Sequence, residues 1–376
     1  MQQTPLRTRS DFSLAPFRRP NDLWAGWQLL TTLVPTALLW ASLPWLWGEH
    51  GLLSLLIAPV LVLFSARSFS LMHDCGHGSF FANPKLNRVV GFCLGVVNAI
   101  PQHPWSRGHA FHHLHNGNWE RYRGPSALLT VEQFQRLTRH QQWLYAVSRH
   151  PLMLFPGGFF YLVLRPRLQL LLGLWEWLRV MTTAPVTAGC TGRCGDGWRA
   201  GASLYRRTLA FESSHWYTGS EFIDLLANNL CVLASWWLMA RWLGPVLFIS
   251  VYTFVMTCSA AIFICIFFVQ HNFPGSYANR TEGWSYFRGA MEGSSNLILP
   301  GVLNWFSADI GFHSIHHLCE RIPNYRLRAC HQANAHLLGD CTYLRLGDLR
   351  RCFNLILWDS AGQNLVSTAD ALLIQT

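Results

Sequence analysis

Four long apolar stretches constrain this chain more than any other feature. Each is long enough to cross the hydrocarbon core of a bilayer, which takes about 20 residues of α-helix. They cover residues 24–47, 51–71, 222–243 and 245–269. Hydrophobic residues make up 51% of the chain and charged residues only 13%, about half the charged share of a typical soluble domain. We therefore expect an all-α membrane protein with four transmembrane helices arranged as two hairpins.

The polar remainder of the chain divides into three parts. These are an N-terminal arm at 1–22, a central loop at 72–220 and a C-terminal region at 270–376. We expect the loop and the C-terminal region to fold together as a cytoplasmic helical cap. The domain boundaries that follow are the arm, a main domain at 23–335 and a C-terminal tail at 336–376.

Two shorter apolar segments do not fit a membrane span. Residues 89–100 are too few, and residues 151–181 are interrupted by proline, glycine and charged side chains. We expect both segments to be buried in the main domain or to lie at the membrane interface. A further segment, 182–210, is rich in glycine and threonine and predicts an irregular loop.

The distribution of basic charge indicates the orientation of the chain. Of the 29 lysine and arginine residues, only Arg241 lies near a loop predicted to be external. Cytoplasmic loops carry an excess of basic residues, so we expect both termini and both large loops in the cytoplasm. The net charge of +10 would also suit a nucleic-acid-binding protein. The basic residues are scattered among apolar runs instead of forming one basic face, which excludes nucleic acid as a partner.

Three histidine clusters lie beside the apolar stretches. On a helix, side chains three and four residues apart share one face. The clusters therefore direct eight imidazoles into one space, which suits transition metals that favour nitrogen ligands. One such cluster occurs by chance on many surfaces, whereas three with this spacing predict a shared site for two metal ions. The eight residues are His73 and His77, then His109, His112 and His113, then His313, His316 and His317.

The residue types narrow the choice of metal. Soluble di-iron bundles use glutamates together with Glu-x-x-His motifs, and no carboxylate recurs at ligand spacing here. Eight histidines exceed the four ligands of one tetrahedral zinc ion, which favours iron over zinc. The spacing alone does not exclude zinc. Cys190 and Cys194 are a poor zinc pair, because they lack partner ligands nearby in the sequence.

The flanks of the clusters carry a resemblance to a known family. The string HDCGHGSFF at 73–81, the HAFHH string at 109–113 and HSIHHLCERIPNYRL at 313–327 resemble the histidine boxes of membrane-bound fatty acid desaturases. The closest likeness is to the acyl-lipid Δ12/ω-6 branch, over roughly residues 20–335. The resemblance implies a di-iron centre that uses O2 and two electrons to introduce a cis double bond into an acyl chain. It also implies that the acyl chain belongs to a membrane lipid.

The resemblance adds a ninth candidate ligand, His271, because desaturases carry an extra histidine after the fourth span. An interfacial histidine that caps a helix C-terminus is the alternative. One turn earlier, where the acyl-CoA branch has an asparagine that helps to hold a metal-bound water, this chain has Phe267. We do not assign that role here. Asp74 and Asp309 are candidates for orienting the histidine rings, and Asp309 lies four residues before His313. A solvated aspartate is the alternative for each.

Electrons must come from a partner. A fused cytochrome b5 domain would show His-Pro-Gly-Gly, and the nearest string, at 155–158, begins with phenylalanine. We therefore expect a separate ferredoxin or cytochrome b5 that docks on the basic cytoplasmic face.

Two other classes of protein compete with a desaturase. Another histidine-box membrane oxygenase, such as a carotenoid ketolase or hydroxylase or a sphingolipid-type hydroxylase, would use a similar metal site. A metal transporter would hold its ligands within the spans, whereas the four apolar stretches contain no histidine.

Overall fold

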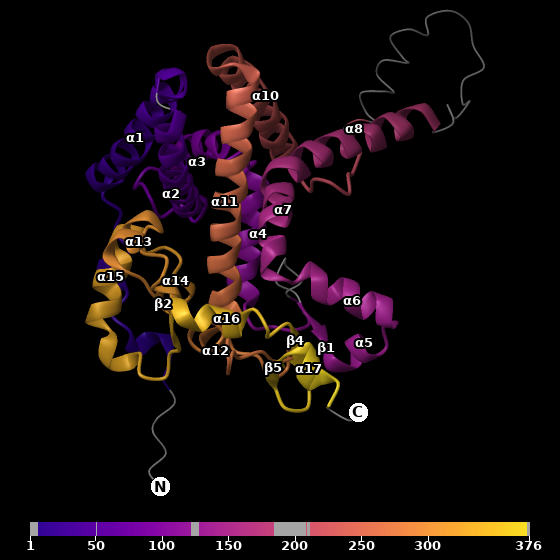
Figure 1. Cartoon of the computed structure of the whole chain (residues 1–376). Coiled ribbons are helices and arrows are strands. Elements are labelled where there is room, and N and C mark those ends of the chain that lie inside the picture. The colour runs from indigo at the N-terminus through magenta and orange to yellow at the C-terminus, as the bar shows by residue number, and fades with distance from the viewer. Residues whose placement is uncertain (1–6, 50, 122–127, 184–207, 209–210, 374–376) are drawn as a thin grey trace, which may run out of the picture.

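The computed structural model describes the chain except for residues 1–6, 50, 122–127, 184–207, 209–210 and 374–376. The predicted irregular loop at 182–210 therefore lies almost wholly outside the described residues, as do Cys190 and Cys194. The described part is mostly helical (Figure 1).

Four helices are long and apolar enough to cross a membrane. They are α1 (Asp22–Glu49), α2 (Gly51–Gly76), α10 (Gly219–Leu243) and α11 (Pro245–His271). Local sequence explains the boundary between the last two. Gly244 has φ 82°, a left-handed conformation that favours glycine, and Pro245 occupies the first turn of α11, where its missing N–H costs nothing. Helices α2 and α11 run further than the apolar stretches alone predicted, so that His73 and His271 lie within them.

The long helices pack as a connected group. Helix α2 packs against both α1 and α11, and α10 packs against α11. Leu43, Leu61 and Val255 form a buried cluster between three of these helices. A second cluster, which includes Phe69, Met72 and Leu94, continues to the shorter helix α3 (Pro84–Val97). The helices are therefore fixed relative to one another near the histidines that end α2 and α11.

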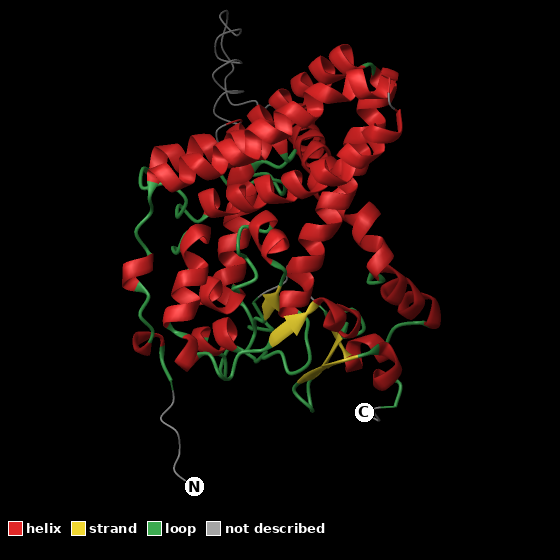
Figure 2. Cartoon of the chain, turned by 60° about the vertical axis from the view of Figure 1, so that its left-hand side comes forward, coloured by secondary structure: helices red, strands yellow, loops and turns green. Residues whose placement is uncertain are grey.

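Shorter helices and strands make up the rest of the described chain (Figure 2). The helices are α4 (Gln102–His115), α5 (Val131–Gln135), α6 (Arg139–Ser148), α7 (Leu154–Phe159), α8 (Arg165–Thr183), α12 (Tyr286–Met291), α13 (Gly301–Phe306), α14 (His313–Leu318), α15 (Asn324–Ala333), α16 (Leu349–Cys352) and α17 (Thr368–Ala371), with a π-helical turn at Phe160–Leu164. The strands are β1 (Leu129–Thr130), β2 (Asn296–Ile298), β3 (Tyr343–Arg345), β4 (Leu357–Asp359) and β5 (Asn364–Val366). Short 3-10 turns cover Arg9–Asp11, Ala15–Phe17, Pro151–Met153, Ala335–Leu337 and Leu346–Asp348.

The short strands correct the expectation of an all-α fold. Strand β2 pairs in parallel with β3, and β4 lies between β1 and β5. Strands of two or three residues are too short to show the alternating pattern by which strands are recognised in a sequence. Three of the five lie beyond residue 335, so the predicted tail contributes to the same sheets as residues of the main domain.

The N-terminal arm covers the third histidine cluster. Phe12 and Leu14 are buried against Ile315 and Leu318 of α14. The backbone nitrogen of Ser13 donates to the side-chain oxygen of Asn334 at 2.8 Å. In both views the described ends of the chain lie on the side of the short strands (Figures 1 and 2).

Candidate metal centre

Each histidine cluster lies at the end of a helix or on a short helix, facing the other clusters. The first cluster ends α2, where His77 continues the helical hydrogen bonding by donating its backbone N–H to the carbonyl of His73 at 3.2 Å. The second lies in the last two turns of α4, and the third occupies the whole of α14. His271 is the last residue of α11. The structure therefore brings all nine predicted ligands together from four helices.

Five of the histidines form one group whose candidate ligand atoms all lie within 4.8 Å of one another. Its members come from all three clusters: His73, His77, His109, His113 and His316. Within pairs on one helix, the Nε2 atoms of His73 and His77 are 3.2 Å apart, and those of His109 and His113 are 3.1 Å apart.

The remaining four histidines form a second group. His112, His271 and His317 lie within the same 4.8 Å limit. The Nε2 atom of His313 lies 3.1 Å from that of His271 and 3.1 Å from that of His317. The two groups adjoin, because the rings of His113 and His317 stack with centroids 4.1 Å apart. Two adjacent nitrogen donor sets are the arrangement that a pair of metal ions requires.

The spacing of the donor atoms fits a shared metal ion. Two nitrogens bound to one ion at about 2.1 Å, with an angle between about 90° and 110°, lie roughly 3.0–3.4 Å apart. The Nε2 pairs at 3.1–3.2 Å match this range. Neither ring nitrogen of His316 has a hydrogen-bond partner in the described part of the chain, although both are buried. A metal ion would satisfy such a nitrogen.

Burial favours the neutral form of six of these rings, which is the form that binds metals. Burial, reinforced by the neighbouring imidazoles, holds the pKa of six of the rings well below the ordinary value for histidine. The six are His109, His112, His113, His313, His316 and His317. A fully protonated cluster of this kind would be strongly disfavoured by mutual repulsion.

Two carboxylates lie beside the rings. The Oδ1 atom of Asp74 lies 3.2 Å from Nδ1 of His73, and its Oδ2 atom accepts hydrogen bonds from the backbone and side chain of Asn324 at 2.7 and 2.8 Å. Asp74 is thus held in place by α15. Glu320 lies beyond α14, with its Oε2 atom 3.5 Å from Nδ1 of His77 and 3.9 Å from Nδ1 of His113. Such outer carboxylates fix the tautomer and orientation of metal-binding histidines.

Asp309 does not lie where the sequence placed it. The prediction assumed one helix from Asp309 to His313, but α14 begins at His313. Asp309 occupies a turn with φ 54°, and its carboxylate forms an ion pair with Arg328 at 2.8 Å. The left-handed conformation breaks the helix, which spacing alone could not reveal.

Several residues around the site were not singled out in the sequence. Trp105 stacks on His109 with centroids 4.9 Å apart, and the Tyr286 hydroxyl donates to the carbonyl of His317 at 2.7 Å. The spacing of Trp105, four residues before His109 on α4, was the one available signal. Tyr286 comes from a distant helix, α12, so no local pattern could have identified it.

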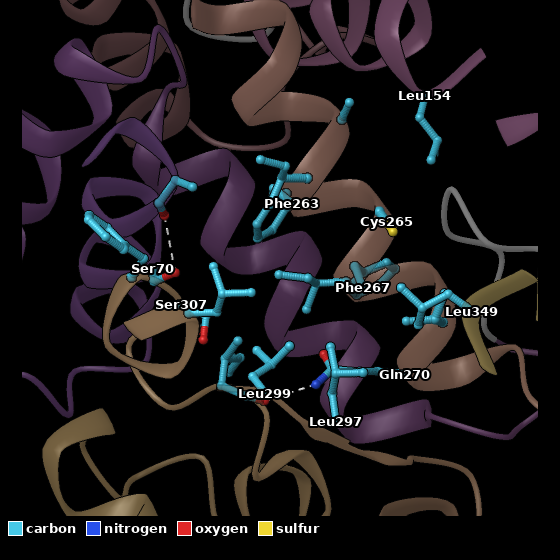
Figure 3. Close-up of a pocket in the computed structure, with 18 of the residues that line it drawn as sticks. Ser70, Leu154, Phe263, Cys265, Phe267, Gln270, Leu297, Leu299, Ser307 and Leu349 are labelled. Carbon is cyan, nitrogen blue, oxygen red and sulfur yellow. Dashed lines mark hydrogen bonds between the residues drawn. The ribbon is translucent and has the colours of Figure 1, made fainter. Parts of the chain in front are cut away.

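An apolar cavity of about 580 Å³ lies against the histidines. His73, His109 and His313 line it, together with aliphatic and aromatic residues of α2, α11 and the segment 297–310. In the view of Figure 3, Ser70 and Ser307 lie on one side and Leu154 and Leu349 on the other. Its volume falls in the range of about 300–1,000 Å³ that is usual for small-molecule sites. Phe267, which replaces the asparagine of the acyl-CoA branch, also lines the cavity, and its ring lies 4.9 Å from that of His112.

The described chain thus combines four candidate membrane spans, nine clustered histidines that could hold metal ions and an apolar cavity beside them. The sequence model described as "Fatty acid desaturase" matches residues 50–346. The chain therefore belongs to the fatty acid desaturase family, whose members are oxidoreductases.

Individual relatives agree with this family. A protein of Bacillus subtilis (strain 168) named "Fatty acid desaturase" is 29% identical over 355 residues, which cover 94% of this chain and 88% of the relative. An endoplasmic-reticulum acyl-lipid omega-3 desaturase (cytochrome b5) of Arabidopsis thaliana is 27% identical, covering 80% of this chain and 65% of the relative. A chloroplastic sn-2 acyl-lipid omega-3 desaturase (ferredoxin) of Helianthus annuus is 26% identical, covering 80% of this chain and 57% of the relative. The chain thus spans less than two thirds of these two plant proteins.

Proposed function

We propose that this protein desaturates an acyl chain that is carried by a membrane lipid, at a di-iron centre held by the nine clustered histidines. The observation that carries this proposal is the apolar cavity, because three of the candidate ligands, His73, His109 and His313, form part of its wall. A chain of methylene groups in that cavity would lie directly against the metal site.

The histidines have a defined part in this reaction. They hold the metal pair, and neutral imidazoles leave its positive charge uncompensated. Bound iron supplies the oxidising chemistry, in which O2, two electrons and two protons remove two hydrogens from neighbouring methylenes and yield two waters. Asp74 and Glu320 keep the rings of His73 and His77 in the orientation that binds metal.

The cavity has the task of positioning. An unactivated methylene offers no charge or hydrogen bond to grip, so the chain must be held by shape, and orientation of the reacting atoms then supplies most of the selectivity. The walls are aliphatic and aromatic, which excludes water from the reacting atoms.

Exposed apolar residues at the cavity favour delivery of the chain from the bilayer. Leu152, Phe155 and Leu346 line the cavity and are also well exposed. A soluble protein rarely exposes such a group of apolar side chains. They suit an acyl chain that stays attached to a lipid while it enters from the side of the membrane.

The position of the double bond is part of the proposal. The flanks of the first and third histidine clusters favour a Δ12/ω-6-like enzyme, whereas the plant relatives carry omega-3 names. We also propose that the four spans form two hairpins, with the histidine site and both termini on the cytoplasmic side. The printed names of the plant relatives, one for cytochrome b5 and one for ferredoxin, support a small separate electron donor.

Expression in a host that lacks polyunsaturated fatty acids tests the function. Mass spectrometry of the total lipids should show acyl chains that have lost two hydrogens, and fragmentation should locate a single double bond. Hydroxylated or ketone-bearing products would instead assign the protein to another histidine-box oxygenase. New double bonds only in acyl-CoA, with none in glycerolipids, would contradict a lipid-linked substrate.

A further inference from the structure

Arg67 is a charged residue deep inside a candidate membrane span. It lies in α2, within the span Leu56–Gly76, and is only 1% exposed. Its distance along the helix axis from His73, six residues later, is about 9 Å. A charged side chain at this depth is costly and is retained where it has a specific role.

The guanidinium group of Arg67 has partners on two other elements. Its Nε donates to the hydroxyl of Thr32 in α1 at 3.0 Å, and its Nη1 donates to the carbonyl oxygen of Trp305. It also lies over the Trp305 ring, 3.8 Å from the centroid, which is close for a cation–π contact. One turn earlier on α2, Phe64 meets the same indole edge-on, with centroids 6.0 Å apart. Phe64 and Arg67 therefore hold Trp305 from one face of α2.

The segment that Arg67 holds is a wall of the cavity. Trp305 is the penultimate residue of α13, and five residues around it line the cavity: Leu303, Phe306, Ser307, Ala308 and Ile310. Ser70, one turn after Arg67 on α2, lines the same end, and Figure 3 shows it beside Ser307. The chain then continues directly into His313.

The same segment contains backbone strain at two successive residues. Ala308 and Asp309 have φ 52° and 54° in succession. The left-handed conformation costs a non-glycine residue about 1–2 kcal/mol, so the turn persists only where its surroundings fix it. Arg67 fixes it from the membrane helices, and Arg328 fixes it from α15 through its ion pair with Asp309. Contacts from outside the segment therefore add to its own backbone hydrogen bonds, in which Ala308 donates to the carbonyl of Trp305 and Asp309 to that of Asn304.

We propose that Arg67 is a positioning residue that, through Trp305, sets the place of the cavity wall relative to the metal site and so selects which pair of methylenes is desaturated. This inference rests on the proposed function. Arg67 touches neither the substrate cavity nor the histidines, because its neighbours Ala66 and Ser70 are the residues of α2 that line the cavity beside it. Its effect on the reaction runs through the carbonyl and ring of Trp305.

Two substitutions test the inference. Arg67→Lys keeps the charge but loses the planar fork and its stacking on an aromatic ring, and Trp305→Leu removes the ring while it keeps the carbonyl. A displacement of about 1 Å can change the rate at a given atom on the order of 100-fold. We therefore expect the ratio of products with a neighbouring double-bond position to the main product to rise at least about tenfold in both variants.

The matched control is Arg167→Lys. Arg167 is partly buried, donates to the backbone carbonyls of Ala99 and Val163 at 2.6 and 3.1 Å and lies over the Trp236 ring. None of these partners lines the cavity. This variant should lower the amount of folded protein without changing the double-bond position. A single unchanged double-bond position in both Arg67→Lys and Trp305→Leu would overturn the inference.

A second measurement is independent of activity. Cys258 and Cys265 line the cavity, whereas Cys93 is exposed on α3, outside the candidate spans. Arg67→Lys should speed alkylation of the two cavity thiols by N-ethylmaleimide relative to Cys93, as measured by mass spectrometry. If the wild-type protein forms no double bond, the proposed function fails, and an unchanged ratio of alkylation rates would still overturn the role of Arg67 in holding the wall.

Discussion

The Nδ1 atom of His271 lies 3.0 Å from the carbonyl oxygen of Gly293. A carbonyl accepts only, so Nδ1 must carry the proton, and Nε2 is left with a lone pair that faces His112 and His313 at 3.1 Å. This arrangement is typical of metal-binding histidines and does not fit a histidine that merely caps a helix.

His271→Ala should therefore behave like loss of a metal ligand. We expect a loss of activity of at least about 100-fold together with lower iron content, because losing a ligand affects both binding and chemistry. His331→Ala is the control, since the Nε2 atom of His331 pairs with the Tyr343 hydroxyl at 3.0 Å and the residue belongs to neither histidine group. The measurements are product formation and iron per chain in purified protein. Normal iron content in His271→Ala would remove this residue from the ligand set.

Glu320 lies close to two candidate ligands from different helices, His77 and His113. Glu320→Gln removes the negative charge with little change in shape. We expect iron affinity to fall about tenfold or more, as it does when other outer partners of metal ligands are replaced. Competition with a chelator measures the change. Glu282→Gln, at an exposed position, should leave the affinity unchanged, and an equal loss in both variants would point to a general charge effect.

The orientation of the chain is tested by reporter fusions. Fusions after Glu49 and Gly244 should report an external position, because each residue lies between two candidate spans. Fusions at Gly195 and Gln363 should report the cytoplasm, as the asymmetry of basic residues predicts. If the reporter at Gly195 reads external, the three histidine clusters cannot all lie on the cytoplasmic side of the membrane.

Electron supply can be tested with purified protein. The sequence has no cytochrome motif and no dinucleotide fingerprint, so O2 and NADPH alone should give no turnover. Addition of a ferredoxin or cytochrome b5 system should restore it. Because an acidic donor would dock on a basic face, turnover should fall as salt rises above about 0.15 M, where the Debye length is about 8 Å. Turnover that does not depend on salt would contradict electrostatic docking of the electron donor.

The sequence predicted the parts of this protein whose signal is local. The spacing of His109, His112 and His113 depends on one helix, and the apolar stretches depend on length and composition. The sequence did not identify Arg67 as a functional candidate. Its contacts with Trp305 depend on the fold, and a single arginine in an apolar stretch carries no local pattern.

The sequence-based predictions that were wrong also concern features that depend on the fold and not on local sequence. Asp309 was placed on a helix that its left-handed backbone conformation interrupts. The strands β2 and β3 are three residues each, and they are held by pairing between segments about 45 residues apart in the sequence, which no local pattern encodes. Glu320 lies 3.5 Å from Nδ1 of His77 because α14 ends just before it.

The most direct test of the central claim is the metal content and turnover of the wild-type protein and His316→Ala, measured on the same purified samples. Both ring nitrogens of His316 are buried and have no hydrogen-bond partner in the described part of the chain. The account predicts about two iron ions per chain and desaturation in the wild type, with both reduced in His316→Ala while the protein still inserts into the membrane. A single zinc ion in the wild type, or full activity in His316→Ala, would contradict it.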